Sequence, residues 1–363
     1  MSLELACFIS PHGYGHATRT IAVLQALQKQ VRDLRAHCFT TAPPELFATS
    51  GLSLTLHPVI TDVGLIQTDA FTVDQPRTVA RLAELLPFRE SLVSRCAGLC
   101  GSCRLILCDI SCLGIAVAQH AEIPSLLVEN FTWDWIYERL DPPADDLLRF
   151  GALLSDYYRQ ATYRIQTDPL CNPVAGNLRC PPMARMRIQE SDRIRERIGC
   201  GARTMVLITM GGIRLDLPFI ERLSGFDDYL FVIAGQQGQR RPSANVLLLD
   251  HDPGLHHPDL IGAADLVICK NGYSTIAECA QTRTPICCVS RHNFAESAVL
   301  DRYVSTMMGG VILELDRFLR GDWLDGLDGL MKQNRAPAPV NGADQAASFI
   351  MSLLQPETRP PAS

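Results

Sequence analysis

Short apolar runs alternate with stretches of helical periodicity along most of the chain. In the first half, the apolar runs predict strands, and apolar residues three or four positions apart predict helices between them. The predicted strands span 3–9, 34–41, 52–59, 105–109 and 125–128, and the predicted helices span 18–30, 79–98, 113–119 and 145–160. This alternation predicts an α/β fold, with a mostly parallel sheet covered by helices on both faces.

The second half repeats the pattern after a segment rich in proline. Residues 168–183 contain four prolines, which interrupt regular structure and are typical of an interdomain connection. Beyond it, strands are predicted at 204–209, 230–234, 246–249, 266–269 and 286–289, and helices at 274–281, 295–303 and 341–354. We therefore expect two domains, residues 1–182 and 183–340, whose sheets face each other across a cleft, and a disordered tail at 355–363.

Composition narrows the functional classes. A net charge of −6 without a basic run argues against nucleic-acid binding, and no apolar stretch reaches the roughly 18 residues of a membrane span. The N-terminus does not resemble a secretory signal, so we expect a cytoplasmic protein and leave peripheral membrane contact open. The fourteen cysteines include a C-x-x-C at Cys100 and Cys103 but lack the second pair of a zinc site, so they are expected to pack as small apolar residues.

The sequence from Phe8 to Arg19 combines glycine and histidine at one predicted sheet edge. It runs from a strand through Gly13 and Gly15 into a helix, which places His12 and His16 where open α/β sheets bind ligands. Glycine lets the backbone approach a ligand closely, and imidazoles titrate near neutral pH. A purely structural turn would need the glycines but not two histidines, so this loop is predicted to be functional.

A second glycine turn, in the C-terminal half, predicts an anion site. The sequence Lys270-Asn-Gly-Tyr-Ser-Thr-Ile-Ala-Glu278 follows a strand and starts a helix, whose free N–H groups and dipole suit a diphosphate. Ser274 or Thr275 is expected to cap this helix, and Glu278 to accept hydrogen bonds from a ribose diol. An ordinary capped turn stays open as the alternative. Neither a G-x-G-x-x-G motif nor a P-loop occurs, which argues against a dehydrogenase or a kinase.

With these residues, the chain resembles nucleotide-sugar glycosyltransferases of the GT-B fold. Gly13-Tyr-Gly-His16 is similar to the Gly-Gly-His loop of the bacterial N-acetylglucosaminyltransferase that makes lipid II. A closer resemblance, up to about residue 323, is to the N-terminal glycosyltransferase-like region of plant-type L-arabinokinases. It is carried in combination by His12-Gly-Tyr-Gly-His-Ala-Thr-Arg19, Asp69-Ala-Phe-Thr-Val-Asp74, Asn130-Phe-Thr-Trp-Asp-Trp-Ile-Tyr137 and Gly272-Tyr-Ser-Thr-Ile-Ala-Glu278. The sugar-kinase half of those proteins has no counterpart here, so no kinase activity is implied.

The resemblance implies two Rossmann-like domains, with the acceptor on residues 1–182, the donor on 183–340 and the helix 341–354 crossing back to the first domain. It implies that His16 is the base that deprotonates the acceptor and that Asp109 orients it. Binding of the diphosphate by His16 and capping of the next helix by Asp109 stay open. Further residues are expected on the acceptor or phosphate side, namely His12, Gly13, Gly15 and Asp134.

The donor side is implied in the same way. Backbone N–H groups around Gly211–Gly212 and Gly272–Thr275 would stabilise the departing diphosphate, and no Asp-x-Asp motif is placed to hold a metal. The implied donor residues are Gly211, Gly212, Asn271, Gly272, Tyr273, Ser274, Thr275, Glu278 and Glu296. Glu296 stands where relatives contact the donor sugar.

We therefore expect an inverting, metal-independent glycosyltransferase that needs no cofactor beyond a nucleotide-sugar co-substrate, a UDP-sugar by resemblance. Its acceptor is not identified by the sequence. Two alternatives on the same fold stay open, a non-catalytic sugar-nucleotide sensor or regulatory protein and a sugar-nucleotide hydrolase or epimerase.

Overall fold

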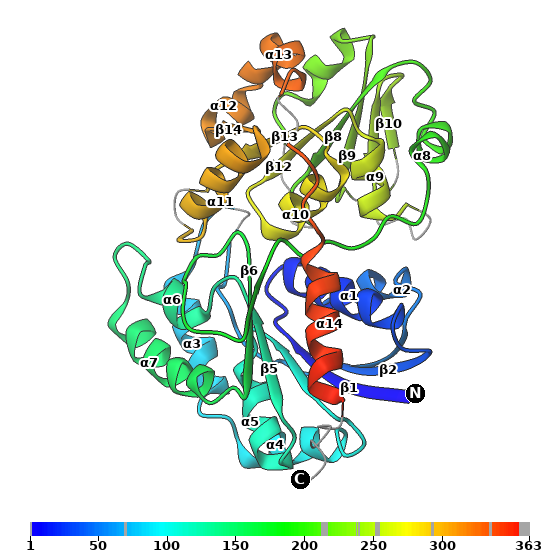
Figure 1. The fold of residues 1–363 in the computed structure, drawn as a ribbon. Helices are drawn as coiled ribbons and strands as arrows, with labels where there is room; N and C mark the ends of the chain where they lie inside the picture. Colours follow the sequence, from blue (N-terminus) through cyan, green and yellow to red (C-terminus); the bar gives the residue numbers. More distant parts are fainter. Residues whose placement is uncertain are drawn as a thin grey trace.

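Two seven-stranded sheets occupy two lobes stacked one above the other (Figure 1). The computed structural model describes residues 2–68, 71–211, 217–236, 238, 240–250, 255–291, 294–333 and 336–355. The first sheet has the order β3-β2-β1-β4-β5-β6-β7, and the second has the order β10-β11-β9-β8-β12-β13-β14. All neighbouring strands are parallel except β10 and β11, so the α/β prediction is confirmed.

Every predicted strand forms, and the bounds differ from the expected ones by a few residues. The first sheet contains β1 (Ser2–Ile9), β2 (Asp33–Phe39), β3 (Ser53–His57), β4 (Ile106–Asp109), β5 (Ser125–Glu129), β6 (Tyr163–Thr167) and β7 (Leu178–Cys180). The second contains β8 (Thr204–Thr209), β9 (Tyr229–Ala234), β10 (Arg240–Ser243), β11 (Val246–Leu249), β12 (Leu266–Lys270), β13 (Ile286–Val289) and β14 (Val311–Leu313).

Helices cover both faces of each sheet. The first lobe contains α1 (Gly15–Gln28), α2 (Glu45–Ala48), α3 (Gln75–Leu85), α4 (Glu90–Gly98), α5 (Cys112–Ala121), α6 (Trp133–Tyr137), α7 (Asp145–Arg159) and the C-terminal α14 (Gly342–Leu354). The second contains α8 (Ser191–Arg197), η1 (Ile220–Gly225), α9 (His257–Ala263), α10 (Tyr273–Thr282), α11 (Ser297–Tyr303), η2 (Val304–Met308), α12 (Leu315–Arg320), η3 (Asp322–Gly326) and α13 (Leu327–Met331).

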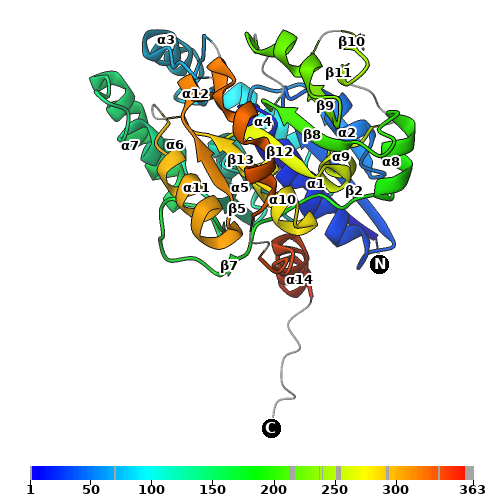
Figure 2. The same cartoon turned by 90° about the horizontal axis from the view of Figure 1, so that it is seen from above.

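The continuous apolar strands are explained by burial on both faces of each sheet. In β1, Leu5 and Cys7 pack with α1 and α14, whereas Ala6 and Phe8 pack on the opposite side with α4 and α5. In the second lobe, α8 to α11 cover one face, and η1, α12, η3 and α13 cover the other. Figure 2 shows these two helical layers from above, on either side of the strands.

The last helix, α14, lies beside α1 in the first lobe (Figure 1). Its apolar residues at helical spacing, among them Ala343, Ala347 and Ile350, are buried in the core beneath β1. Gly342 is required where this helix starts, because a Cβ there would lie 1.9 Å from the Pro181 carbonyl oxygen. The chain thus returns to the first lobe beside the point where it left, with Gly342 N–H donating to the Pro182 carbonyl at 3.0 Å.

Two sequence-based expectations were wrong in detail. The helix predicted over 79–98 is two helices, α3 and α4, because Leu86 precedes a proline and adopts an extended backbone. The segment 168–183 contains the short strand β7, which adds an edge to the first sheet despite the surrounding prolines. The tail expected at 355–363 lies outside the described residues apart from Gln355.

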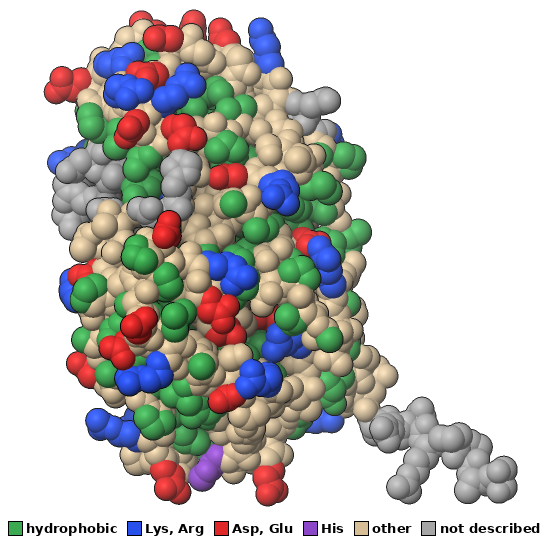
Figure 3. Space-filling view, turned by 90° about the vertical axis from the view of Figure 1, so that its left-hand side faces the viewer, with side chains coloured by type: hydrophobic (Ala, Val, Ile, Leu, Met, Phe, Trp, Pro, Cys, Tyr) green, Lys and Arg blue, Asp and Glu red, His purple; other side chains and the backbone are tan. Residues whose placement is uncertain are grey.

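The surface carries both signs of charge. On the face drawn in Figure 3, acidic and basic side chains are interspersed with apolar ones over both lobes. None of the helices in the described ranges is long and apolar enough to cross a membrane.

Candidate functional site

A cleft of about 510 Å³ opens where the carboxyl ends of the two sheets face each other. Both predicted glycine turns reach it, one from each lobe. The expected site residues that line it are His12, Gly13, Gly15, His16, Gly211, Gly272, Tyr273, Ser274, Thr275, Glu278 and Glu296. Because these residues are up to 284 positions apart (296 − 12), the cleft exists only when both lobes are in place.

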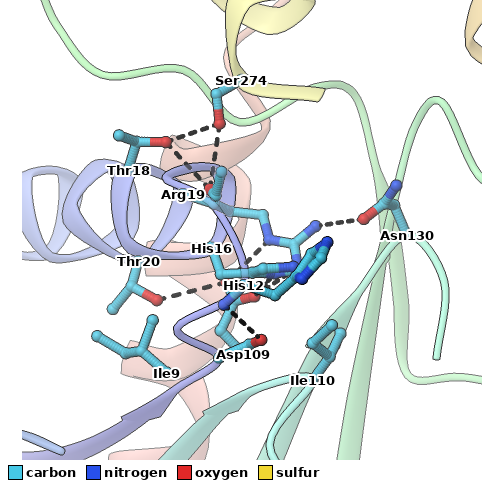
Figure 4. A network of polar contacts seen from close by, with 12 residues as sticks. Ile9, His12, His16, Thr18, Arg19, Thr20, Asp109, Ile110, Asn130 and Ser274 are labelled. Carbon is cyan, nitrogen blue, oxygen red and sulfur yellow. Dashed lines mark hydrogen bonds and ion pairs between the residues drawn. The ribbon is translucent and has the colours of Figure 1, made fainter. Parts of the chain in front are cut away.

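A buried polar network lies beneath the first turn (Figure 4). His16 Nδ1 is 2.8 Å from Asp109 Oδ1, and Asp109 is fully buried at the end of β4. Arg19, one turn along α1 from His16, donates from Nε to Oδ2 at 2.8 Å and from Nη2 to Oδ1 at 2.5 Å. Asp109 is not a helix cap: the helix that follows it, α5, begins three residues later, and its cap residue is Ser111.

The charge of Asp109 follows from this network. Burial would raise the pKa of its carboxyl group, but the charge and hydrogen bonds of Arg19 and the bond to His16 outweigh burial and hold the pKa below its ordinary value. Asp109 is therefore a carboxylate at neutral pH, and His16 Nδ1 donates its proton to it. The lone pair of His16 is then on Nε2, the nitrogen that a base would use.

Arg19 stands in the sequence motif without a role, and the structure gives it four partners, one of them His16, whose Nδ1 lies 3.3 Å from Arg19 Nη2. Besides Asp109, its Nη1 donates to Asn130 Oδ1 at 2.7 Å, and its guanidinium lies 5.0 Å from the ring centroid of Tyr273 in the other lobe. Only 1 % of Arg19 is exposed. A motif that pairs histidine with arginine three residues later on a helix could have signalled this, because both side chains face the same side.

The start of α10 meets the start of α1 across the cleft. Ser274 Oγ donates to the Gly15 carbonyl at 3.1 Å and lies 2.6 Å from Thr18 Oγ1. Ser274 or Thr275 was expected to cap this helix, but neither does, because α10 begins at Tyr273 and both residues lie within it. Its cap residue, Gly272, provides no side-chain acceptor, so no cap side chain covers the first N–H groups of α10, an arrangement that can bind an anion.

Tyr273 joins the two lobes. Its hydroxyl lies 2.7 Å from Thr167 Oγ1, at the end of β6, and accepts from the Met183 N–H at 2.9 Å. Burial raises the pKa of this phenol, so it stays protonated and able to donate to Thr167 at neutral pH.

Lys270 lines the cleft from the second lobe, at the end of β12, and was not singled out from the sequence. A Cβ on Gly211 would lie 2.8 Å from Lys270 Cε, so the glycine makes room for the lysine stem. Burial and the nearby charge of Arg291 lower the pKa of Lys270 to about 7. A signal was present: the chain has three lysines against thirty arginines, and this one directly precedes the glycine turn.

Arg291 and Glu296 form an ion pair at the same end of the cleft. Arg291 Nη2 donates to Glu296 Oε1 at 2.7 Å, and its guanidinium carbon lies 4.0 Å from the Phe294 ring centroid. Arg291 Nε is buried and has no partner among the described residues. Glu296 therefore lines the cleft as a paired carboxylate and not as a free one.

Glu278 is held by two basic side chains. Its Oε1 accepts from Arg185 Nε at 2.8 Å, and its Oε2 lies 2.9 Å from His257 Nδ1. Burial would raise its pKa, but the charge of Arg185 and the bond to His257 lower it to about 2. Glu278 is thus a fixed carboxylate in the wall of the cleft, 2 % exposed.

Three expected site residues of the described ranges do not line the cleft: Asp109 lies beneath it, bonded to His16, and the other two are Asn271 and Asp134. Asn271 donates to the Ser297 carbonyl at 3.1 Å and to Asp301 Oδ1 at 2.5 Å, so its side chain braces the turn against α11. Asp134 lies on α6, close to Gly151 of α7. Gly212, also expected here, lies outside the described residues. Among the described residues, no group of three or more His, Cys, Asp or Glu is arranged to hold a metal ion.

Comparison with known proteins agrees with this architecture. No protein-family model matches the sequence. The chain is 26% identical to L-arabinokinase of Arabidopsis thaliana over 357 residues, which is 96% of this chain but 34% of that protein, so it spans about a third of its length.

Solved glycosyltransferases have the same fold. SnogD from Streptomyces nogalater is 17% identical with a TM-score of 0.55, and the match covers 97% of this chain and 99% of that one. VinC, solved in complex with dTDP, is 13% identical with a TM-score of 0.60 over 96% and 94% of the two chains. MurG of Acinetobacter baumannii is 15% identical with a TM-score of 0.51 over 97% and 99%. The chain therefore has the GT-B fold of nucleotide-sugar glycosyltransferases.

Proposed function

We propose that this protein is an inverting glycosyltransferase that moves a sugar from a nucleotide-sugar donor to an acceptor hydroxyl. The observation that carries the proposal is the buried His16–Asp109–Arg19 network, which faces the start of α10 across one cleft. One lobe thus presents a base, and the other presents an anion site. The His16–Asp109 pair favours catalysis over a purely sensing role, because binding alone does not require an oriented base.

The chemistry that we propose uses the base of the first lobe and the anion site of the second. His16 Nε2 takes the acceptor proton as the acceptor oxygen attacks the anomeric carbon, and the bond from that carbon to the diphosphate breaks with inversion. Asp109 stabilises the imidazolium that forms. The departing diphosphate carries away the bonding electrons, and its charge is stabilised by the N–H groups of α10 and by Lys270. These fixed positive groups support a metal-independent mechanism.

Donor recognition in this proposal uses Glu278 for the ribose diol and Gly272–Thr275 for the diphosphate. A solved structure of VinC with dTDP supports a nucleoside diphosphate as the ligand class. We propose a UDP-sugar as the donor, without a further cofactor. The fourteen cysteines, all of them free and all but Cys171 buried, support a reducing compartment such as the cytoplasm.

Calorimetric and thermal-shift titration with UDP, dTDP, ADP, GDP and CDP tests the donor class. At least one of them is expected to bind and to raise the melting temperature, since a ligand that binds only the folded state stabilises it. UDP is the one expected from the proposed donor. The corresponding nucleoside without phosphates serves as the control. Failure of every nucleoside diphosphate to bind would contradict the proposal.

Replacing Lys270 with methionine is expected to weaken binding of the same nucleoside diphosphate by about tenfold to a hundredfold, because a hydrogen bond to a charged group contributes about 1.5–3 kcal/mol. Lys270 is charged below its pKa of about 7 and neutral above it, so the wild-type affinity should fall from pH 6 to pH 8 more steeply than that of the variant. Isothermal titration calorimetry at several pH values measures both effects.

Lys29→Met is the matched control, because Lys29 is exposed and pairs with Asp344 on α14. Equal dissociation constants for Lys270→Met and wild type across this pH range would remove Lys270 from the donor site.

A further inference from the structure

The two histidines of the first turn present opposite hydrogen-bonding groups. His16 donates from Nδ1 to Asp109, which leaves the Nε2 lone pair free. His12 Nδ1 instead accepts from the Leu65 backbone N–H at 3.3 Å, so its neutral ring carries the proton on Nε2. Burial and the charges of neighbouring cations lower the pKa of His12 to about 3, so it stays neutral at physiological pH. His12 is therefore a fixed donor beside a fixed acceptor.

The orientation of His12 is set by its surroundings. Gly64 passes directly over it, since a Cβ on Gly64 would lie 2.7 Å from His12 Cβ. The Tyr137 hydroxyl donates to the Gly64 carbonyl at 2.8 Å and holds this loop down. The ring of Trp133 meets His12 edge to face, with centroids 5.0 Å apart. The imidazole is thus packed in place and needs no substrate to order it.

Asn130 is a second oriented donor on the same side. Because a guanidinium can only donate, the 2.7 Å contact from Arg19 assigns the near amide atom as Oδ1 and turns Nδ2 away. Asn130 lines the cleft and is 1 % exposed, and its Nδ2 has no partner among the described residues. Gln67, the neighbouring cleft residue on the loop that covers His12, likewise has a buried Nε2 without a partner in the described ranges.

We propose that the acceptor is a neutral polyol, a monosaccharide or cyclitol, and that His12, Asn130 and Gln67 bind the oxygens beside the hydroxyl that His16 deprotonates. The three groups are uncharged donors, which suit hydroxyl oxygens. Two of them, Asn130 Nδ2 and Gln67 Nε2, are buried without a partner among the described residues, which is costly unless a ligand satisfies them. Phe131, which lines the cleft with its ring 5.9 Å from that of His16, offers an apolar face for the C–H side of a sugar.

This inference rests on the proposed function, so the experiment separates the two. Wild-type protein saturated with UDP is titrated with glucose, galactose, arabinose, xylose and myo-inositol, and with glucuronate and galacturonate, by thermal shift and ligand-observed NMR. At least one neutral polyol is expected to bind, and its uronate partner to bind at least tenfold more weakly. Binding of UDP without any neutral polyol would overturn the acceptor class but leave the donor proposal standing, whereas absence of UDP binding would count against the proposed function itself.

Variants then test the residues. His12→Phe keeps the ring volume but removes the donor, so it should weaken polyol binding about tenfold with unchanged UDP affinity. His12→Gln restores an N–H and should recover part of the loss, while His120→Gln, at an exposed site on α5, should bind as wild type does. Equal polyol affinity in His12→Phe and wild type, or a uronate that binds as tightly as its neutral partner, would overturn the inference.

Discussion

Replacing His16 with alanine is expected to slow release of nucleoside diphosphate from the donor by about 10²–10⁴-fold, the usual contribution of a positioned general base. His16 Nε2 is free to take a proton, because Nδ1 is engaged by Asp109 at 2.8 Å. The initial rate of diphosphate release from the nucleotide sugar that matches the tightest-binding diphosphate measures the effect.

Binding should survive this change, since the diphosphate site that we propose is formed by α10 and Lys270 in the other lobe. The titration of the nucleoside diphosphate therefore serves as the internal control, and His120→Ala as the control for loss of an exposed imidazole. A His16→Ala enzyme that turns over donor at the wild-type rate would contradict the assignment of the base. Free sugar as the product with every acceptor would instead favour hydrolysis on the same site.

Replacing Arg19 with methionine is expected to reduce the free energy of unfolding by about 3–5 kcal/mol at pH 7, the cost of breaking a buried ion pair by removing one partner. Arg19 and Asp109 are both almost completely buried, and Arg19 donates to both carboxylate oxygens. The substitution leaves the carboxylate without its cation and also removes the contacts to Asn130 and Tyr273. Urea denaturation followed by circular dichroism measures the loss.

The loss should shrink as the pH falls. In the wild-type protein the pKa of Asp109 lies below its ordinary value of 3.8, so its contribution to stability is present above about pH 4 and is lost as the pH falls through the lower value. Without Arg19, burial is the dominant effect and raises the pKa of Asp109. As the pH falls, the Asp109 carboxylate of the variant is therefore protonated, and the cost of an unpaired buried charge disappears. The difference between the two proteins is therefore expected to be larger at pH 8 than at pH 5.

A second substitution distinguishes an unpaired charge from lost packing. In the double variant Arg19→Met, Asp109→Asn the buried carboxylate is absent, so more than half of the lost stability should return. If the double variant is as unstable as Arg19→Met alone, the cost comes from packing and the ion pair contributes little.

The strands and most long helices could be predicted from the order of residues because their apolar patterns are local. The continuous apolar run from Leu5 to Ile9 predicts a buried strand, and the structure places it in the middle of the first sheet. The short edge strands β7, β10 and β14 were missed, since an edge strand needs little apolar sequence and depends on a neighbour for its hydrogen bonds. The inner strand β6 was also missed, because Arg164 and Gln166 interrupt its apolar run. The break at Leu86 could have been read from the following proline.

The candidate site likewise has features that local sequence predicts and features that only the fold decides. Glycine and histidine in one turn indicated a ligand loop, and the glycine turn before Tyr273 indicated an anion site, because both signals lie within a few residues. Lys270 and Arg19 remained without roles until the fold placed Gly211 against one and Asp109 against the other. These contacts join residues 59 and 90 positions apart and are made by packing, so a linear pattern carries no information about them. The sequence therefore indicated the two turns, whereas packing within each lobe set the tautomers of His12 and His16 and the partners of Arg19 and Arg291, and the meeting of the lobes formed the cleft.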